Sequence, residues 1–183
     1  MSADGFIQTF SGRFVQPLAL SSDDVALEDI AHALGNQCRF GGHCRSFYSV
    51  AQHSCLVADL VAAEDADAES ALWALLHDAS EAYLVDLPHP LKHSAFGELY
   101  RDVETRLMET ICRRFGLPPE APALVKRIDR AVLATERREL MRDGHDWPEL
   151  AGVEPLPLSI EPWLPPRAVE EFTRRYDELE ARR

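Results

Sequence analysis

The sequence has no uninterrupted apolar run of about 20 residues, the length that a membrane-spanning helix requires. Its first residues, MSADGFIQTF, lack the charged and then apolar layout of a secretory signal. The four cysteines include no CxxC pair, so neither a disulfide framework nor a cysteine-based zinc site is expected. We therefore expect a cytoplasmic protein that does not associate with a membrane and keeps its thiols reduced.

Positive charge is also scarce. The chain carries 19 Lys and Arg against 31 Asp and Glu, a formal net charge of -12. A field of that sign repels polyanions, so a nucleic acid polymer is not an expected partner. A small anion such as a nucleotide could still bind, because a local cation or metal acts at short range whereas the global field is screened beyond about 10 Å.

The hydrophobic pattern predicts an all-α fold. With 183 residues and 46% hydrophobic content, residues 1–183 can bury one core and form a single compact domain. Residues 1–21 are expected to form a short β-hairpin or an irregular arm, 143–166 a proline-rich surface connection, and 167–183 the C-terminal helix. Periodicity and capping signals predict a bundle of about six helices, over residues 22–36, 48–63, 68–84, 96–115, 121–141 and 167–181.

Two of these helices carry more detailed expectations. On helix 96–115, Leu99, Val103, Leu107 and Ile111 recur at four-residue spacing, which predicts that all four are buried. On helix 121–141, the run ERREL that begins at Glu136 is expected to be a salt-bridged surface face. The alternative is that Glu136 and Arg137, two helical turns beyond Asp129, brace the site.

Two imidazoles and two carboxylates stand among apolar neighbours at His53, His77, Asp78 and Asp129. Such groups are costly to bury unless they are paired or bound to a metal. Two nitrogen and two oxygen ligands suit Mn, Fe, Co, Ni or Zn better than a Ca site or a thiolate site, and Mg stays open. An ion with four protein ligands keeps positions for water and substrate, and the chemistry it would promote is hydrolysis of a phosphate ester.

Two further carboxylates are expected beside this cluster. Glu81 follows His77 by four residues, so on one continuous helix it would share the face of His77 and Asp78. Asp86 lies in the turn VDLPHPLK, where prolines stiffen the backbone. We interpret both as catalytic groups that position the attacking water and transfer protons.

These residues resemble a known family. His53, the pair His77-Asp78, and Asp129 match the H...HD...D pattern of the HD-domain metal phosphohydrolases. The segment LLHDASEAYLVDLPHPLK resembles bacterial HD-domain 5'-deoxynucleotidases, and CRFGGHCRSFYSVAQHS with LATERREL resembles a prophage-associated branch of that group. The likeness runs from about Phe6 to Met141 and implies the HD-domain helical fold, one divalent ion on the four named residues, and a possible homodimer.

The resemblance also assigns Glu81 and Asp86 as acid/base residues and Arg39 as a phosphate contact. In the nucleotidases an arginine and then a tryptophan precede the first ligand histidine, whereas this chain has Arg39-Phe40 followed by Gly41-Gly42-His43. Arginine offers bidentate phosphate recognition and the glycines allow close backbone approach, although an ordinary turn is the alternative. The expected substrate-binding residues are Arg39, Phe40, His43 and Lys92.

The predicted function is metal-dependent phosphohydrolysis, in the form of a 5'-nucleotidase that releases phosphate from (deoxy)nucleoside 5'-monophosphates. One alternative is a deoxynucleoside triphosphate triphosphohydrolase on the same scaffold, with Arg45 and Lys92 as extra phosphate contacts. The other is a non-catalytic regulatory module that only binds a nucleotide or a metal.

Overall fold

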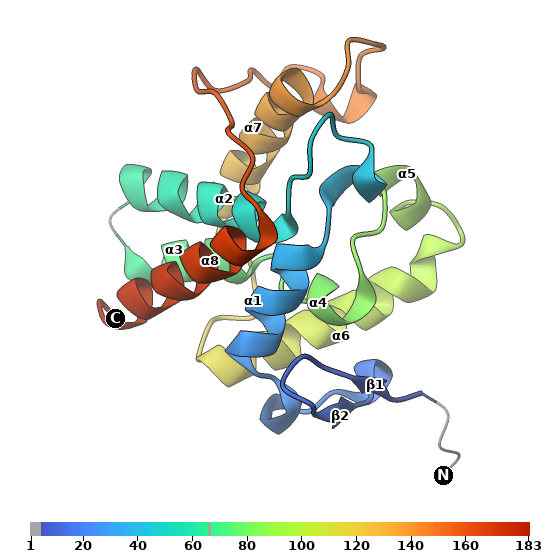
Figure 1. Ribbon diagram of the computed structural model, residues 1–183, viewed down its shortest axis with the longest axis vertical. Coiled ribbons are helices and arrows are strands. Elements are labelled where there is room, and N and C mark those ends of the chain that lie inside the picture. The colour runs from blue at the N-terminus through green and yellow to red at the C-terminus, as the bar shows by residue number, and fades with distance from the viewer. Residues whose placement is uncertain (1–4, 66) are drawn as a thin grey trace.

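The structure, a computed structural model, describes residues 5–65 and 67–183, and it confirms an all-α fold with a short N-terminal hairpin (Figure 1). None of the helices in these two ranges is both long and apolar enough to span a membrane. The helices are α1 (Leu27–Asn36), α2 (Val50–Glu64), α3 (Ala68–Leu76), α4 (Glu81–Leu84), α5 (His89–Lys92), α6 (Gly97–Phe115), α7 (Ala123–Leu140) and α8 (Pro165–Glu180). Single 3₁₀ turns are η1 (Pro17–Ala19), η2 (Ser22–Asp24), η3 (Arg39–Gly42) and η4 (Pro148–Leu150).

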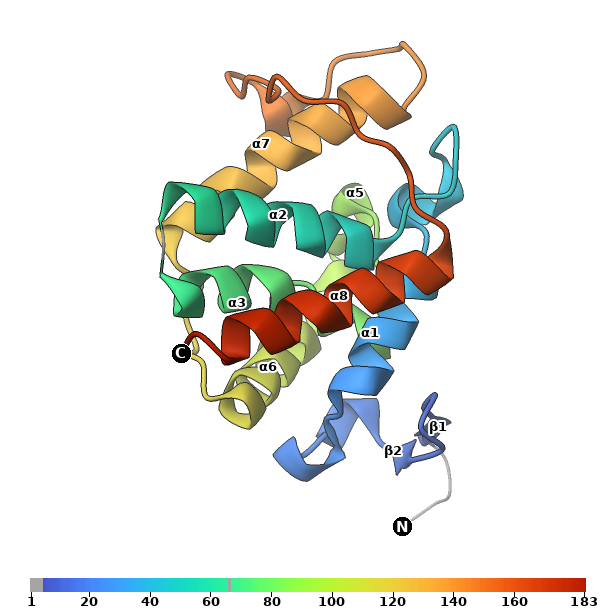
Figure 2. The same cartoon turned by 60° about the vertical axis from the view of Figure 1, so that its left-hand side comes forward.

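The core lies where α8 crosses α1, α2 and α3, as both ribbon views show (Figure 2). Phe172 of α8 is fully buried at this crossing. Apolar side chains at three- and four-residue spacing on the other helices belong to the same core, because that spacing gathers apolar groups on one stripe. Fully buried examples are Ile30, Leu34, Val57, Val61, Leu72 and Leu75.

The N-terminal arm is a hairpin. β1 (Ile7–Gln8) and β2 (Phe14–Val15) pair antiparallel, with Ile7 opposite Val15. The hairpin is held on α1 because the backbone N–H and the hydroxyl of Ser11 donate to the Asp29 carboxylate at 2.7 and 2.9 Å. The Phe10 ring also stacks on His32 with centroids 3.7 Å apart.

The start of the first helix differs from the expectation. Ser22–Asp24 forms the separate turn η2, and α1 begins only at Leu27. The Asp24 carboxylate accepts from the Ser21 N–H at 3.0 Å and from its hydroxyl at 2.6 Å, so this capping box closes the short turn.

The expected continuous helix 68–84 is broken. α3 ends at Leu76 and α4 begins at Glu81, with a turn over residues 77–80 between them. In that turn the Ala79 N–H donates to Leu76 O at 2.9 Å and the Glu81 N–H to Asp78 O at 3.0 Å, bonds of 3₁₀ span. Asp78 is meanwhile held by Arg39 and His53 at 3.4 and 3.6 Å, so tertiary contacts override helix propensity here.

The expected burial of Leu99 is wrong. Leu99 is 71% exposed and Phe96 is 74% exposed, whereas Val103, Leu107 and Ile111 are buried. The first turns of α6 lie against α5 and extend beyond the main core, so the stripe is covered only from Val103 onward.

The proline-rich connection lies against α7 and then against α2. Arg137 donates to His145 O at 2.9 Å, and Arg138 donates to Leu156 O at 3.0 Å. Further along, the Gln52 side chain bridges the segment by donating to Glu161 O and accepting from the Trp163 N–H, both at 2.7 Å. The connection is therefore fixed at several points on the helices it crosses.

Gly35 allows the close approach of α1 and α8. A Cβ at this position would lie 2.4 Å from Val169 Cγ2. We expect Gly35→Ala to lower the free energy of unfolding by about 1–2 kcal/mol, because overpacking outweighs the gain in helix propensity. Urea denaturation measures this change.

The matched control is Gly144→Ala, whose Cβ would meet only Arg142 O at 3.9 Å. That variant should stay within about 0.5 kcal/mol of the parent. Equal unfolding midpoints for the two variants would contradict the close helix contact.

Candidate metal centre and adjoining pocket

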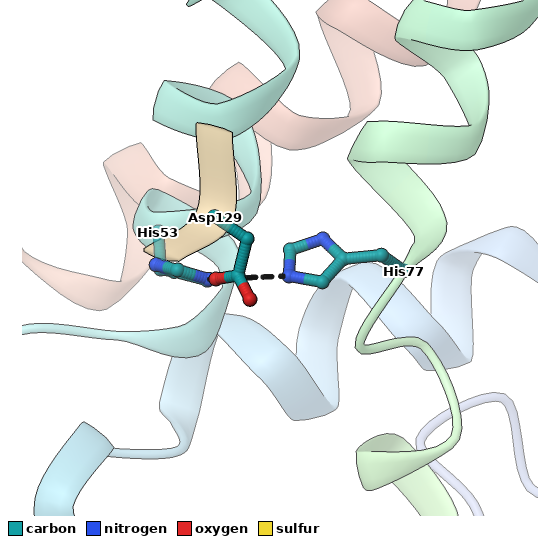
Figure 3. Close-up of side chains that lie close together, drawn as sticks. All are labelled: His53, His77 and Asp129. Atoms are coloured by element: carbon teal, nitrogen blue, oxygen red, sulfur yellow. Dashed lines mark hydrogen bonds and ion pairs between the residues drawn. The ribbon is translucent and has the colours of Figure 1, made fainter. Parts of the chain in front are cut away.

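Three helical elements bring His53, His77 and Asp129 together. His53 lies on α2, His77 caps the end of α3, and Asp129 lies on α7 (Figure 3). His53 Nε2 is 3.2 Å from His77 Nε2 and 3.2 Å from Asp129 Oδ1, and His77 Nε2 is 3.8 Å from the same oxygen. These three residues could hold a metal ion.

The spacing suits a small divalent ion. Nitrogen and oxygen ligands lie roughly 2.1 Å from Zn and similar ions, so neighbouring ligand atoms are separated by about 3 to 3.5 Å. The contacts of 3.2 to 3.8 Å are close to that range.

The hydrogen bonds of the two rings indicate which nitrogens are free. His77 Nδ1 is 2.6 Å from Ala74 O, a carbonyl that can only accept, so Nδ1 donates. His53 Nδ1 lies 2.7 Å from Glu136 Oε1 and donates to that carboxylate. In neutral rings both Nε2 atoms therefore present lone pairs to each other, and these repel unless a metal ion or an extra proton lies between them. Outer hydrogen bonds of this kind orient histidines that ligate metals.

The carboxylates favour positive charge at this point. Burial and Arg39 oppose protonation of His53, but Glu136 and Asp129 outweigh them and raise its pKa to about 10. Burial likewise opposes protonation of His77, whose pKa is raised by Asp78 and Asp129. A proton thus occupies the cluster when metal is absent, and a metal ion must displace it.

Asp78, the fourth ligand predicted from the sequence, lies beside the trio. Its Oδ2 is 3.3 Å from His77 Nε2 and 3.6 Å from His53 Nε2. The same oxygen accepts from Arg39 Nη1 at 3.4 Å. Burial opposes its ionisation, yet His77, His53 and Arg39 together hold the pKa of Asp78 far below its usual range. Asp78 is therefore an ionised carboxylate facing both imidazoles.

Glu136 is fully buried, so its expected place on a solvated, salt-bridged face is wrong. One oxygen accepts from His53 Nδ1 at 2.7 Å and the other from Arg39 Nη2 at 3.1 Å. Burial opposes its ionisation, but Arg39 and His53 lower its pKa. Its position seven residues after Asp129, two turns along α7 on the same face, was the signal for this role.

A pocket of about 700 Å³ opens beside the candidate metal centre. The two expected catalytic residues and the four expected substrate-binding residues line it, together with Asp78 and Asp129. They are Arg39, Phe40, His43, Glu81, Asp86 and Lys92. The pocket also has residues that sequence reasoning missed, namely Leu87, Leu133, Met141, Trp147, Pro148 and Glu149.

Glu81 and Asp86 lie at this pocket, although Glu81 is not on one continuous helix with His77 and Asp78 as expected. Glu81 is 6% exposed, and its Oε2 has no hydrogen-bond partner among the described residues. Burial, then Asp78 and Asp86, raise the pKa of Glu81 well above its usual range. The carboxyl group of Glu81 therefore holds a proton more readily than a solvated glutamate does.

Gln37, which sequence reasoning missed, sets the position of both catalytic candidates. Its Nε2 donates to Glu81 O at 3.0 Å, and its Oε1 accepts from the Asp86 N–H at 2.6 Å. Val85 between them has φ 71°, in the left-handed region that valine rarely adopts. One side chain thus bridges the ends of a strained segment and fixes the spacing of two carboxylates.

The cations lining the pocket are already paired. Arg39 is 8% exposed and bonded to Asp78 and Glu136, although its buried Nε lacks a partner in the described part of the chain. Lys92 Nζ donates to Glu104 Oε1 at 2.7 Å. His43 is exposed at the pocket. Arg45 lies outside the lining and donates to Met141 O. The lysine and the arginine of the pocket therefore offer a ligand little positive charge that a carboxylate does not already balance.

Comparison with known proteins places the chain in a family. It is 41% identical over 176 residues to the uncharacterized protein YfdR of Escherichia coli (strain K12), a match that covers 95% of both chains. The chain belongs to the YfdR family. The uncharacterized protein RCAP_rcc00048 of Rhodobacter capsulatus is 40% identical over 126 residues, covering 67% of this chain and 64% of that protein. No family model matches the sequence.

We expect Glu136→Gln to weaken binding of a divalent metal by about 10- to 100-fold, because an amide cannot supply a charged oxygen to both His53 and Arg39. Titration of the metal-stripped protein with Mn or Zn measures the affinity. Glu139→Gln is the matched control, since Glu139 pairs with Arg138 on the outer side of the same helix. Equal metal affinities in the two variants would show that Glu136 does not support metal binding.

Proposed function

We propose that this protein is a metal-dependent phosphohydrolase of the HD type, which releases phosphate from (deoxy)nucleoside 5'-monophosphates. The observation that carries the proposal is the pair of facing Nε2 atoms, 3.2 Å apart, with both Nδ1 atoms engaged in outer hydrogen bonds. Such a pair beside ionised carboxylates has the donor chemistry of a divalent ion site, and it borders a pocket large enough for a nucleotide.

Asp78 completes the proposed ligand set. Its Oδ2 faces both imidazoles, so His53, His77, Asp78 and Asp129 supply two nitrogens and two oxygens to one ion. A divalent ion bound there lowers the pKa of water and polarises a phosphoryl oxygen, the chemistry that ester hydrolysis needs.

The remaining groups handle the water and the leaving group. Glu81 lines the pocket, and its carboxyl group donates a proton to the leaving oxygen. Asp86, anchored through Gln37, orients the attacking water and accepts the proton that the water releases. Arg39 lines the pocket and presents its guanidinium to the phosphate while its terminal nitrogens stay bonded to Asp78 and Glu136.

A monophosphate fits the charge of the pocket better than a triphosphate. Arg39 and Lys92, the lysine and arginine among the lining residues, are each paired with a carboxylate. A triphosphate would bring extra negative charge toward Asp78, Glu81 and Asp86 with few free cations to offset it. Catalysis rather than mere binding is supported by Glu81, whose unpaired buried oxygen has a cost that a binding module need not bear.

The test is phosphate release by metal-stripped protein reconstituted with Mn, Co, Mg or Zn, assayed on deoxy- and ribonucleoside mono- and triphosphates. We expect metal-dependent orthophosphate from the monophosphates. Tripolyphosphate from triphosphates would select the triphosphohydrolase instead. Nucleotide binding without any turnover would select the regulatory module.

Asp78→Ala should abolish both metal binding and hydrolysis, because it removes a charged ligand and leaves Arg39 without one of its two partners. Metal content measured by elemental analysis and phosphate release provide the two readouts. Full activity in this variant would contradict the ligand set.

Glu81→Gln should keep the metal and lower kcat by about 10²- to 10⁴-fold, because the amide is isosteric but cannot transfer the proton. Measuring metal content together with kcat separates the two roles. Loss of metal in Glu81→Gln would instead place Glu81 among the ligands.

A further inference from the structure

Two aromatic side chains from distant segments meet at the pocket. Phe40 belongs to η3 and Trp147 directly precedes η4. Their ring centroids are 5.7 Å apart and their planes meet at 62°, so the rings form an open corner. Both side chains line the pocket and both are half-buried. We call Phe40 and Trp147 the aromatic corner.

Phe40 has a strained backbone conformation. Phe40 has φ 57° and ψ 29°, in the left-handed region that is uncommon for residues other than glycine. Such a conformation costs of order 1–3 kcal/mol and is typical of ligand-binding segments. The guanidinium of the neighbouring Arg39 lies 5.2 Å from the Phe40 ring centre and so supports it from the ionic side of the pocket.

The residues before and after Trp147 in the chain are hydrogen-bonded to arginines of α7. On one side Arg137 donates to His145 O at 2.9 Å and to Asp146 Oδ1 at 3.1 Å. On the other, Arg130 donates to Glu149 O at 3.0 Å. Both arginines project from α7, the helix that carries Asp129, so the tryptophan is tied to the same rigid element as the metal centre.

The other two tryptophans have structural roles that Trp147 lacks. Trp73 is 8% exposed and donates to Pro118 O at 3.0 Å. Trp163 packs against the guanidinium groups of Arg167 and Arg175. Trp147 is not part of the hydrophobic core, and its ring contact within the described chain is with Phe40. A large aromatic group anchored at a pocket but not needed by the core is suited to contact a ligand.

The pocket combines ionic and apolar walls. Asp78, Asp129 and Arg39 lie at the metal centre, and Leu133 lies one turn along α7 from Asp129, about 6 Å away. Met141 and Pro148 continue the apolar lining beside the aromatic corner. Because Arg39 and Phe40 are adjacent in the chain, the two kinds of wall meet at this loop. A ligand that fills the pocket has an anionic end and a flat apolar end.

We propose that the aromatic corner binds the purine or pyrimidine base of the substrate by stacking, while the phosphate lies at the metal centre. This inference rests on the proposed function for the phosphate end. A flat base can stack on one ring and present its edge to the other, the two arrangements that aromatic pairs favour. Stacking is worth about 1–3 kcal/mol per base and depends little on base identity, so the corner selects for a base without choosing strongly among them.

The test compares a substrate that has a base with one that lacks it. Trp147→Ala should lower kcat/KM for deoxynucleoside 5'-monophosphates by about 5- to 150-fold, the equivalent of 1–3 kcal/mol, mainly through KM. Its kcat/KM for deoxyribose 5-phosphate, which has no base, should not change. Trp147→Phe should restore most of the loss because it retains an aromatic face. Equal losses on both substrates, or no loss on either, would overturn the proposal.

A binding measurement separates this inference from the proposed function. Deoxyadenosine, which carries no phosphate, is titrated into the metal-loaded protein while tryptophan fluorescence is followed. We expect quenching in the parent chain that is lost in Trp147→Phe. Quenching without turnover of any nucleotide would retain the base site and reject the hydrolase, whereas turnover of nucleotides with unchanged quenching in Trp147→Phe would retain the hydrolase and reject the base site.

Discussion

The buried carboxylate of Glu136 is the group on which the rest of the site depends. It lies in the interior of the protein and is bonded to His53 on one side and Arg39 on the other, at 2.7 and 3.1 Å. A buried charge is tolerated only when its partners are well placed, and removing one partner of such a pair costs about 3–5 kcal/mol. The orientation of His53, the position of Arg39 and hence that of Asp78 all follow from this one interaction.

The same network explains why the chain is irregular near the pocket. Arg39 follows α1 in the short turn η3, and Asp78 follows α3 in the turn that breaks the expected helix. Both turns place a charged group toward Glu136 or the histidines, which regular helices would direct elsewhere. Gln37 extends the arrangement to Glu81 and Asp86. The backbone is irregular where these long side chains converge, and the surrounding helices hold the irregular turns in place.

Most of the fold could be predicted from the sequence because helices are encoded locally. The start or end of α2, α6, α7 and α8 lies within two residues of the expected position, since apolar spacing, glycine and proline mark those points. The hairpin and the irregular connection also follow from local composition. The predicted burial of Leu99 was wrong because periodicity identifies an apolar face but does not show whether another element covers it.

The sequence by itself determined which side chains form the cluster of His53, His77 and Asp129, because histidines and carboxylates among apolar residues are costly to bury and therefore conspicuous. Only the tertiary structure decided how they are connected. Glu136 meets His53 across 83 positions and Arg39 across 97, and Gln37 reaches Glu81 and Asp86 across 44 and 49. The same holds for Trp147, whose aperiodic segment gives no sign of its contact with Phe40. Short-range patterns report on helices and burial, whereas contacts between distant segments depend on how the helices pack.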